Sequence, residues 1–228
     1  WALPGSGGIH RASEGLVNTV RFSVILVDPP WKYRNWSDKK HGAAIAHYQT
    51  MDLPELQAIP VGEWAATSSV LMLWTTWPKL DQGMRLIEAW GFAYVTGIPW
   101  IKVVPSSGEI RRGVGFWTMS ASEMLLIARR GEPKRKDING GKDKPIGLFV
   151  DEDGQRVFYA PIRRHSAKPL EVHGWVEETL DGPYLELFAR QERSGWTCYG
   201  DDLGWHLGDG GVVRIVRARG LPGDQCSA

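Results

Sequence analysis

The sequence has little cysteine, no excess of charge of one sign and no long apolar run. Its two cysteines, Cys198 and Cys226, are too few for a disulfide framework or a four-thiolate zinc site, and no His/Cys cluster has metal-ligand spacing. We therefore expect no metal and a reducing, cytoplasmic setting. The 27 basic and 26 acidic residues leave a formal net charge of +1, so a polyanion site has to be a local patch. No stretch approaches the roughly 18 apolar residues that a membrane span needs.

What is present is typical of a folded α/β domain. Apolar residues make up 43% and charged residues 23% of the 228 residues, which allows a sizeable core within one domain. Apolar, β-branched runs alternate with segments of helical spacing, which indicates strands packed beside helices. We expect strands at 21–27, 69–75, 92–101, 124–128 and 184–189, and helices at 52–59, 78–90 and 168–180. We assign 1–20 to a flexible arm, 21–207 to the folded domain and 208–228 to a basic tail.

The most informative residues, Asp28, Pro29, Pro30 and Trp31, directly follow the first expected strand. Open α/β sheets bind ligands at the carboxyl ends of their strands. Two consecutive prolines fix the backbone, so they hold the neighbouring carboxylate and indole in one rigid arrangement. Asp28 and the Pro30 carbonyl can accept the two N–H groups of a nucleobase amine, and Trp31 offers a stacking face. The same four residues also suit an ordinary turn followed by a core tryptophan.

Three basic segments supply local positive charge despite the near-neutral total. Such segments contact phosphates in nucleic-acid-binding proteins, or they form a solvated face. Because they are interleaved with the other motifs, we interpret them as phosphate contacts that position a polymer without reading its sequence. They comprise Arg111 and Arg112; Arg129, Arg130, Lys134, Arg135 and Lys136; and Arg163, Arg164 and His165.

An ordered series of motifs resembles the MT-A70-like methyltransferases, which use S-adenosylmethionine to methylate the exocyclic amine of adenine. The resemblance extends from about Val24 to Leu203. Its motifs are DPPW (28–31), HYQTM (47–51), LMLWTT (71–76), WIK (100–102), SAKP (166–169), LELFAR (185–190) and WTCYGDDL (196–203). The resemblance implies a Rossmann-like methyltransferase fold of class α/β, with a mixed, mostly parallel sheet and helices on both faces. The order is permuted, because the catalytic motif precedes the cofactor motif.

The resemblance also implies site residues, position by position. The DPPW turn would be catalytic, and Lys168 matches a lysine at the methionine end of the cofactor, where an ammonium pairs with a carboxylate. Asp201 and Asp202 replace an amide pair that many family members have beside the adenosine. The candidate cofactor residues are Asp28, Lys168, Phe188, Arg190, Gly200, Asp201 and Asp202. The candidate substrate residues are Lys32, Tyr33, His47, Arg111, Arg112, Glu123, Arg163, Arg164 and His165.

The implied function is methyl transfer from S-adenosylmethionine to the amine of adenine in nucleic acid. DNA is preferred over RNA by analogy with bacterial and phage members of the family. The expected partner is nucleic acid and not a membrane, and the sequence leaves a homodimer or heterodimer open. The alternatives are an RNA adenine methyltransferase, a cytosine amine methyltransferase, a catalytically silent nucleic-acid-binding subunit and a methyltransferase for a free small molecule. The intact DPPW motif argues against the silent subunit.

Overall fold

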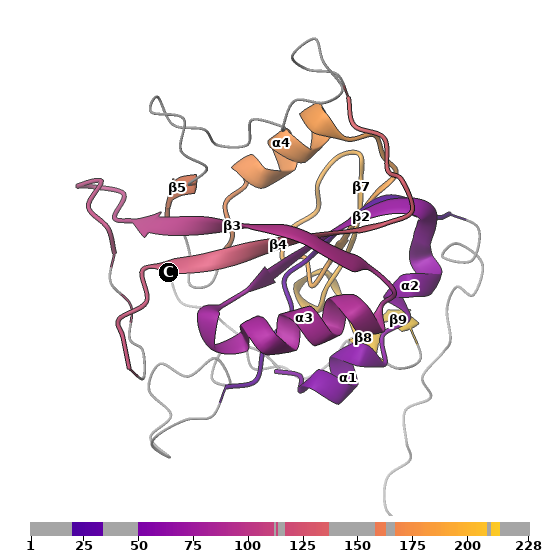
Figure 1. Cartoon of the computed structure of the whole chain (residues 1–228), viewed down its shortest axis with the longest axis horizontal. Coiled ribbons are helices and arrows are strands. Elements are labelled where there is room, and N and C mark those ends of the chain that lie inside the picture. The colour runs from indigo at the N-terminus through magenta and orange to yellow at the C-terminus, as the bar shows by residue number, and fades with distance from the viewer. Residues whose placement is uncertain are drawn as a thin grey trace, which may run out of the picture.

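The computed structural model describes residues 20–33, 50–111, 113, 117–136, 158–162, 167–208 and 211–214. Helices separate β1 from β2, β2 from β3 and β5 from β6, whereas among the described residues β3, β4 and β5 follow one another directly (Figure 1). The strands are β1 (Phe22–Val27), β2 (Ala65–Thr75), β3 (Ala93–Val103), β4 (Ser122–Arg130), β5 (Phe158–Pro161), β6 (Tyr184–Leu187), β7 (Trp196–Tyr199), β8 (Trp205–Gly208) and β9 (Gly211–Arg214). The helices are α1 (Leu53–Gln57), α2 (Val61–Trp64), α3 (Leu80–Ala89) and α4 (Glu171–Thr179), with 3-10 turns η2 (Trp77–Lys79) and η3 (Asp201–Leu203). Among the described residues, no helix is long and apolar enough to cross a membrane.

Seven strands form one mixed sheet in the order β5-β3-β4-β2-β1-β6-β7. In this sheet β4 runs antiparallel to both of its neighbours, and the other pairings are parallel. From β1 the chain crosses to β2 on one side and later returns to β6 on the other, so the strand order reverses at β1 and β6. Ligands of α/β sheets bind beyond the strand ends at such a reversal. We call the end where the parallel strands finish the carboxyl edge, and the β3 arrow in Figure 1 points toward it.

Helices cover both faces of the sheet. Ile25 and Val27 of β1 pack in the core cluster that contains residues of α1, α2 and α3, whereas Val24 and Leu26 pack in the cluster that contains residues of α4. Figure 1 shows α3 and α1 on one side of the sheet and α4 on the other. A strand that is buried on both faces reads as a continuous apolar run, which is why β1 is recognisable in the sequence. The predicted Rossmann-like α/β architecture, mostly parallel with helices on both faces, is confirmed.

Local signals predicted most of the elements correctly. At the start of α1 the Asp52 carboxylate accepts the Glu55 N–H and the Glu55 carboxylate accepts the Asp52 N–H, which is the capping box that the sequence indicates. After α3, Gly91 adopts a left-handed φ of 77° that ends the helix. The strand predicted at 69–75 begins earlier, at Ala65. The sequence did not predict α2 and β5, each of which has 4 residues.

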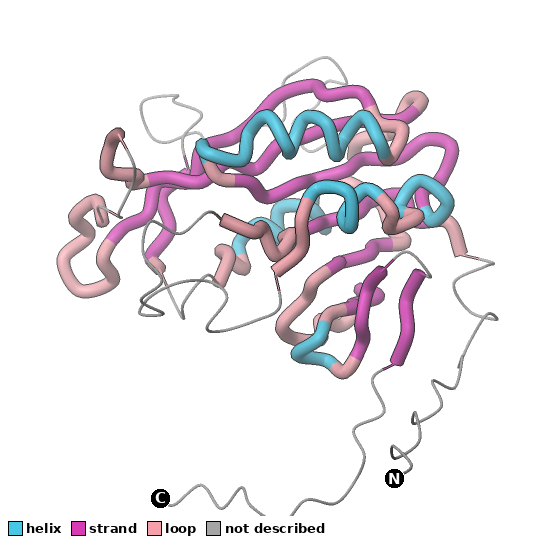
Figure 2. Tube along the Cα trace, turned by 90° about the horizontal axis from the view of Figure 1, so that it is seen from below, coloured by secondary structure: helices cyan, strands magenta, loops and turns pink. Residues whose placement is uncertain are grey.

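A second, smaller sheet follows the main one. β8 and β9 pair antiparallel as a two-stranded hairpin that lies apart from the helices α3 and α4 (Figure 2). Trp205 at the start of β8 meets Tyr199 at the end of β7 edge to face, with ring centroids 5.3 Å apart. β9 takes up part of the segment 208–228 that we assigned to a basic tail.

The basic segment 129–136 lies at the end of the sheet opposite the carboxyl edge. Because β4 is antiparallel, it ends where β2 begins, and Arg130 stands in register with Ser69. Lys136 donates a hydrogen bond of 2.7 Å to the Glu177 carbonyl near the end of α4, where a cation is favourable. We interpreted this segment, like the other two, as a phosphate contact; the structure places it away from the catalytic turn, where Arg130 and Lys136 donate hydrogen bonds to carbonyl groups of the protein. Strand direction, which the sequence does not display, decided its position.

Arg130 in this segment has a structural role. Its guanidinium donates hydrogen bonds of 2.7, 2.7 and 3.1 Å to three backbone carbonyls, those of Gly62, Trp90 and Gly91. It also lies 4.9 Å from the centroid of the Phe92 ring. Since these carbonyls belong to α2 and to the end of α3, Arg130 joins both helices to the last residue of β4.

Candidate functional site

Asp28 lies at the carboxyl edge, where the strand order reverses. It follows β1 directly, and the parallel register of β1 and β6 sets Val27 beside Leu187. The Asp28 N–H donates to the Leu187 carbonyl at 3.4 Å, so Asp28 and Phe188 leave the sheet side by side. The DPPW turn and the LELFAR motif therefore meet at one place, although they are far apart in the sequence.

The DPPW turn is held against Met51. The Pro30 carbonyl accepts the Met51 N–H at 2.8 Å, and the Lys32 N–H donates to the Met51 carbonyl at 3.2 Å. A carbonyl oxygen has two lone pairs, so Pro30 keeps the capacity to accept a second donor. Trp31 is only 4% exposed, packs in the core cluster and donates its indole N–H to the Trp74 carbonyl at 3.2 Å. This position differs from the open stacking face that we expected, and it makes Trp31 an anchor of the turn.

Four charged side chains, that of Asp28 included, form a network. The Lys168 ammonium lies 2.7 Å from Asp28 Oδ1 and 3.3 Å from Glu123 Oε2. Glu123 also forms an ion pair with Lys102. Asp28 and Lys168 are 22% and 13% exposed, and Lys102 and Glu123 are 27% and 12% exposed. The network is thus shielded from water without being sealed from it.

Two buried tryptophans lie against the two ammonium groups of this network. Trp74 on β2 and Trp100 on β3 meet edge to face, with ring centroids 5.9 Å apart. The Lys168 ammonium lies 5.9 Å from the centroid of the Trp74 ring, and the Lys102 ammonium lies 5.2 Å from that of Trp100. The face of an indole attracts a cation, more strongly where water is excluded. Each ammonium is therefore held between a ring and a carboxylate.

Burial and neighbouring charges shift the pKa values of the network in different directions. Burial raises the pKa of the Asp28 carboxyl, Lys168 opposes this rise, and the charge of Glu123 adds to it. Burial also acts to raise the pKa of Glu123, but Lys168 and Lys102 together outweigh it and lower that pKa. Burial acts to lower the pKa of Lys168, and the two carboxylates outweigh it, so Lys168 stays charged. Glu123 is therefore firmly ionised, whereas the charge of Asp28 is more easily lost.

The turns after β6 and β7 lie against each other beside Asp28. The Ala189 N–H donates to the Tyr199 carbonyl at 3.0 Å. A Cβ on Gly200 would stand 2.1 Å from the Ala189 oxygen, so only glycine allows the two turns to approach this closely. Phe188 has a φ of 61°, a left-handed conformation that is costly for a residue with a side chain and is concentrated at functional sites.

Three charged candidate residues follow these two turns. Arg190 comes after β6, and its positive charge acts on the Asp28 carboxyl, where it opposes the effect of burial. Asp201 and Asp202 are exposed in η3, after β7. One cation and two carboxylates at one edge suit a ligand that carries both a carboxylate and hydroxyl groups.

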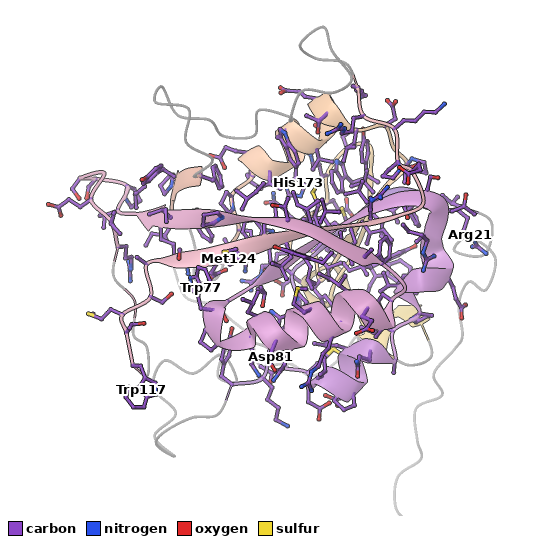
Figure 3. All side chains as sticks on the ribbon, in the orientation of Figure 1. Arg21, Trp77, Asp81, Trp117, Met124 and His173 are labelled. Carbon is purple, nitrogen blue, oxygen red and sulfur yellow. The ribbon has the colours of Figure 1, made fainter. Side chains whose placement is uncertain are left out.

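The remaining candidate residues are only partly within the described part of the chain. Lys32 is exposed beside the DPPW turn, and the Tyr33 hydroxyl shares a hydrogen bond of 2.8 Å with Thr76 at the end of β2. Arg111 is exposed on the loop between β3 and β4, which opens at the carboxyl edge. Trp117 on the same loop is fully exposed and extends away from the sheet (Figure 3). Outside the described residues lie His47, Arg112, Arg163, Arg164 and His165.

Sequence reasoning did not identify Lys102, Trp74 and Trp100 as site residues. Their motifs, WIK and LMLWTT, were recognised without a role for these side chains. The pairing of β3 with β4 supplies that role, because it sets Trp100 beside Glu123 on one face of the sheet and Lys102 next to them.

Comparison with known proteins identifies a family and several relatives. A family model described as MT-A70 matches residues 22–202. The chain is 28% identical over 187 residues to an Arabidopsis thaliana protein named N(6)-adenosine-methyltransferase MT-A70-like, covering 80% of this chain and 24% of that protein. It is 28% identical over 201 residues to the type II methyltransferase M.MunI of Mycoplasma sp, covering 80% and 78%. It is 28% identical over 205 residues to the Homo sapiens N(6)-adenosine-methyltransferase catalytic subunit METTL3, covering 87% and 31%. The chain thus spans about a quarter to a third of the plant and human relatives.

Proposed function

This chain belongs to the MT-A70 family, and we propose that it transfers a methyl group from S-adenosylmethionine to the exocyclic amine of adenine in DNA. Methyltransferases of this family depend on S-adenosylmethionine. The family match runs from β1 into η3 and includes the DPPW turn and the turns after β6 and β7. The observation that carries the proposal is the shielded Asp28 carboxylate, which Lys168 holds at the carboxyl edge beside Phe188.

The side chains at the carboxyl edge fit S-adenosylmethionine by their chemistry. The Lys168 and Arg190 cations suit the carboxylate of its amino-acid part. Asp201 and Asp202 can accept hydrogen bonds from ribose hydroxyls or from the adenine amine of the cofactor. The close approach of the two turns at Gly200 brings these side chains to one edge. When bound, S-adenosylmethionine supplies a methyl group that a positively charged sulfur makes electrophilic.

Asp28 orients the amine of the target adenine. That amine is a weak nucleophile because its lone pair is delocalised into the ring, and a carboxylate that accepts one N–H favours the lone pair on nitrogen. Lys168, 2.7 Å away, holds the Asp28 carboxylate in one orientation, and the Pro30 carbonyl accepts the second N–H. Positive charge that develops on the nitrogen lies beside Asp28, which stabilises it. Buried Trp31 keeps the turn in place and leaves stacking of the base to other groups.

DNA is proposed as the polymer by analogy with the type II methyltransferase. RNA is the second candidate because the human N(6)-adenosine-methyltransferase subunit is as similar to this chain as the type II enzyme is, at 28% identity each. The exposed Arg111 at the carboxyl edge supports a polyanion over a free small molecule.

The test measures methyl transfer from labelled S-adenosylmethionine to unmethylated DNA and to RNA, with nucleoside mass spectrometry of the product. We expect N6-methyladenine in DNA, and a loss of at least about 100-fold in Asp28→Asn, since a group that prepares the nucleophile contributes on that order. Asparagine keeps the size of the side chain and removes its charge. The matched control is Asp181→Asn, which removes a carboxylate that pairs with Lys136 away from the carboxyl edge and should retain full activity.

Three results would contradict the proposal. Methylcytosine as the product would assign a different base. Unchanged transfer by a folded Asp28→Asn variant would remove the role of Asp28. Cofactor binding without transfer to either polymer would point to a small-molecule substrate or to a required second subunit.

A further inference from the structure

Lys102 connects the charged network to the loop between β3 and β4. Its ammonium pairs with Glu123 and lies 5.2 Å from the centroid of the Trp100 ring. Its backbone N–H donates to the Ala121 carbonyl at 2.9 Å, and its carbonyl accepts the Arg111 N–H at 2.8 Å. Both the backbone and the side chain of Lys102 are therefore held in place, which is unusual for a lysine that only faces solvent.

The network balances two cations against two anions. With Lys168 alone, Asp28 and Glu123 would share one cation in a poorly hydrated place, where two carboxylates raise each other's pKa. Lys102 supplies the second cation from β3. Charges reach Glu123 from β3 (Lys102), from the segment before α4 (Lys168) and from the turn after β1 (Asp28), and Arg190 acts on Asp28.

We propose that Lys102 is a positioning residue for methyl transfer: by neutralising Glu123 from β3, it leaves Lys168 to align the Asp28 carboxylate. The inference rests on the proposed function. The distances agree with it, because Lys168 lies 2.7 Å from Asp28 and 3.3 Å from Glu123. Without Lys102, the Glu123 carboxylate would draw Lys168 toward itself, and Asp28 would lose both its orientation and part of its negative charge.

The competing role for a lysine at this edge is a direct phosphate contact. Lys102 is less suited to it than the exposed Arg111, because Glu123 and the Trp100 ring already hold its ammonium. The two roles also have different consequences. Loss of a phosphate contact raises KM and weakens the salt dependence of binding. Loss of a positioning residue lowers kcat and changes its pH dependence.

The experiment compares wild type, Lys102→Met, Lys102→Arg and Lys136→Met by kcat, KM for the polymer and pH profile. Methionine keeps an aliphatic stem without charge, and arginine keeps the charge. In Lys102→Met we expect kcat at pH 7 to fall about tenfold or more, the acid limb to move to higher pH, and KM to change little. Lys102→Arg should recover part of the loss. Lys136→Met is the matched control, because Lys136 lies away from this edge, where its ammonium is 3.3 Å from Asp181 Oδ1. This variant should behave as wild type.

A second measurement does not depend on activity. Carboxyl carbon NMR titration should show the Glu123 signal titrating at higher pH in Lys102→Met than in wild type, and Lys102→Gln carries the same expectation if the methionine variant does not fold. An unchanged Glu123 titration in Lys102→Met would overturn the proposal, and this measurement does not require that the protein methylates a polymer. A wild-type protein that methylates no polymer would count against the proposed function alone. A higher KM with an unchanged acid limb would overturn it in favour of a phosphate contact. A lower melting temperature with wild-type kinetics of the folded fraction would overturn it in favour of a structural role.

Discussion

Two partly buried cations stand at opposite ends of the same sheet and are held in different ways. At the carboxyl edge, Lys168 lies between two carboxylates, those of Asp28 and Glu123. At the other end, Arg130 donates to three backbone carbonyls. Each cation also lies over an aromatic ring, at 5.9 Å from the ring centroid for Lys168 and at 4.9 Å for Arg130. The partners of Lys168 titrate, and the partners of Arg130 do not.

The difference separates a functional from a stabilising use of a shielded charge. Carbonyl groups accept hydrogen bonds at every pH, so the contacts of Arg130 are permanent and join α2 and α3 to β4. Carboxylates change charge with pH and with nearby ligands, so Lys168 can be shared unequally between its two partners. Removing part of a cation's hydration costs free energy for both Lys168 and Arg130. The contacts of Arg130 make the structure rigid, whereas those of Lys168 leave a charge that can be adjusted.

The largest expected effect follows from Lys168→Met, which removes the ammonium at the carboxyl edge. Asp28 and Glu123 would then face each other without their shared cation, so the pKa of Asp28 should rise further and its orientation should be lost. We expect methyl transfer to fall by at least about 100-fold at pH 7 and to recover partly at higher pH. Steady-state kinetics across pH, with circular dichroism to verify folding, test this. Near-normal activity in the folded variant would remove Lys168 from the mechanism.

The next largest effect follows from Arg130→Met, which removes the guanidinium at the opposite end of the sheet. Three carbonyls lose a charged donor, so the free energy of unfolding should fall by about 3 kcal/mol, while turnover of the folded fraction should not change. Urea denaturation and kinetics at low temperature measure the two quantities. Arg129→Met is the control, because Arg129 is exposed and its contacts, an ion pair with Glu132 and a hydrogen bond of 3.1 Å to the Gly131 carbonyl, are local, so its effect should stay below about 1 kcal/mol. Equal losses in the two variants would contradict the role of Arg130.

The smallest effect concerns Arg193, a partly exposed cation with a titrating partner. Arg193 donates two hydrogen bonds to Glu177, at 2.7 and 2.8 Å, and the Trp196 indole donates a third at 2.7 Å. These hydrogen bonds, that from Arg193 first, lower the pKa of Glu177 from 4.5 to about 2. Because the pKa is lower in the folded than in the unfolded chain, the pair stabilises fully above about pH 4.5 and loses its contribution toward pH 2.

Glu177→Gln tests this pH dependence. At pH 7 we expect the free energy of unfolding to fall by about 1 kcal/mol or less, because the pair is partly exposed to water. The difference from wild type should shrink as the pH falls below 4.5, whereas the difference caused by Arg130→Met should persist. Urea denaturation at a series of pH values gives both comparisons. A Glu177→Gln difference that grows in acid would refute the assignment.

Motif positions predicted the chemical groups of the site better than their contacts. Asp28, Glu123 and Lys168 were all candidates, but nothing in the sequence indicates that one ammonium lies between the two carboxylates. Trp31 was interpreted as a stacking face, because a tryptophan after a turn reads the same whether its ring is open or buried. The segment 129–136 was grouped with the other basic segments, because composition carries no information on strand direction.

Short stretches of the sequence specify the local elements and the chemistry that they carry. The apolar run of β1, the prolines that end it, the capping box of α1 and the glycine after α3 act over a few neighbouring residues, so spacing alone reveals them. Which ammonium meets which carboxylate depends instead on the folded arrangement of the strands. Asp28 and Lys168 are 140 residues apart in the chain. Asp28 and Lys168 come together with Glu123 because β6 pairs beside β1 and because β4, which carries Glu123, runs antiparallel between β2 and β3. Such contacts depend on strand order, direction and register, which are properties of the whole sheet.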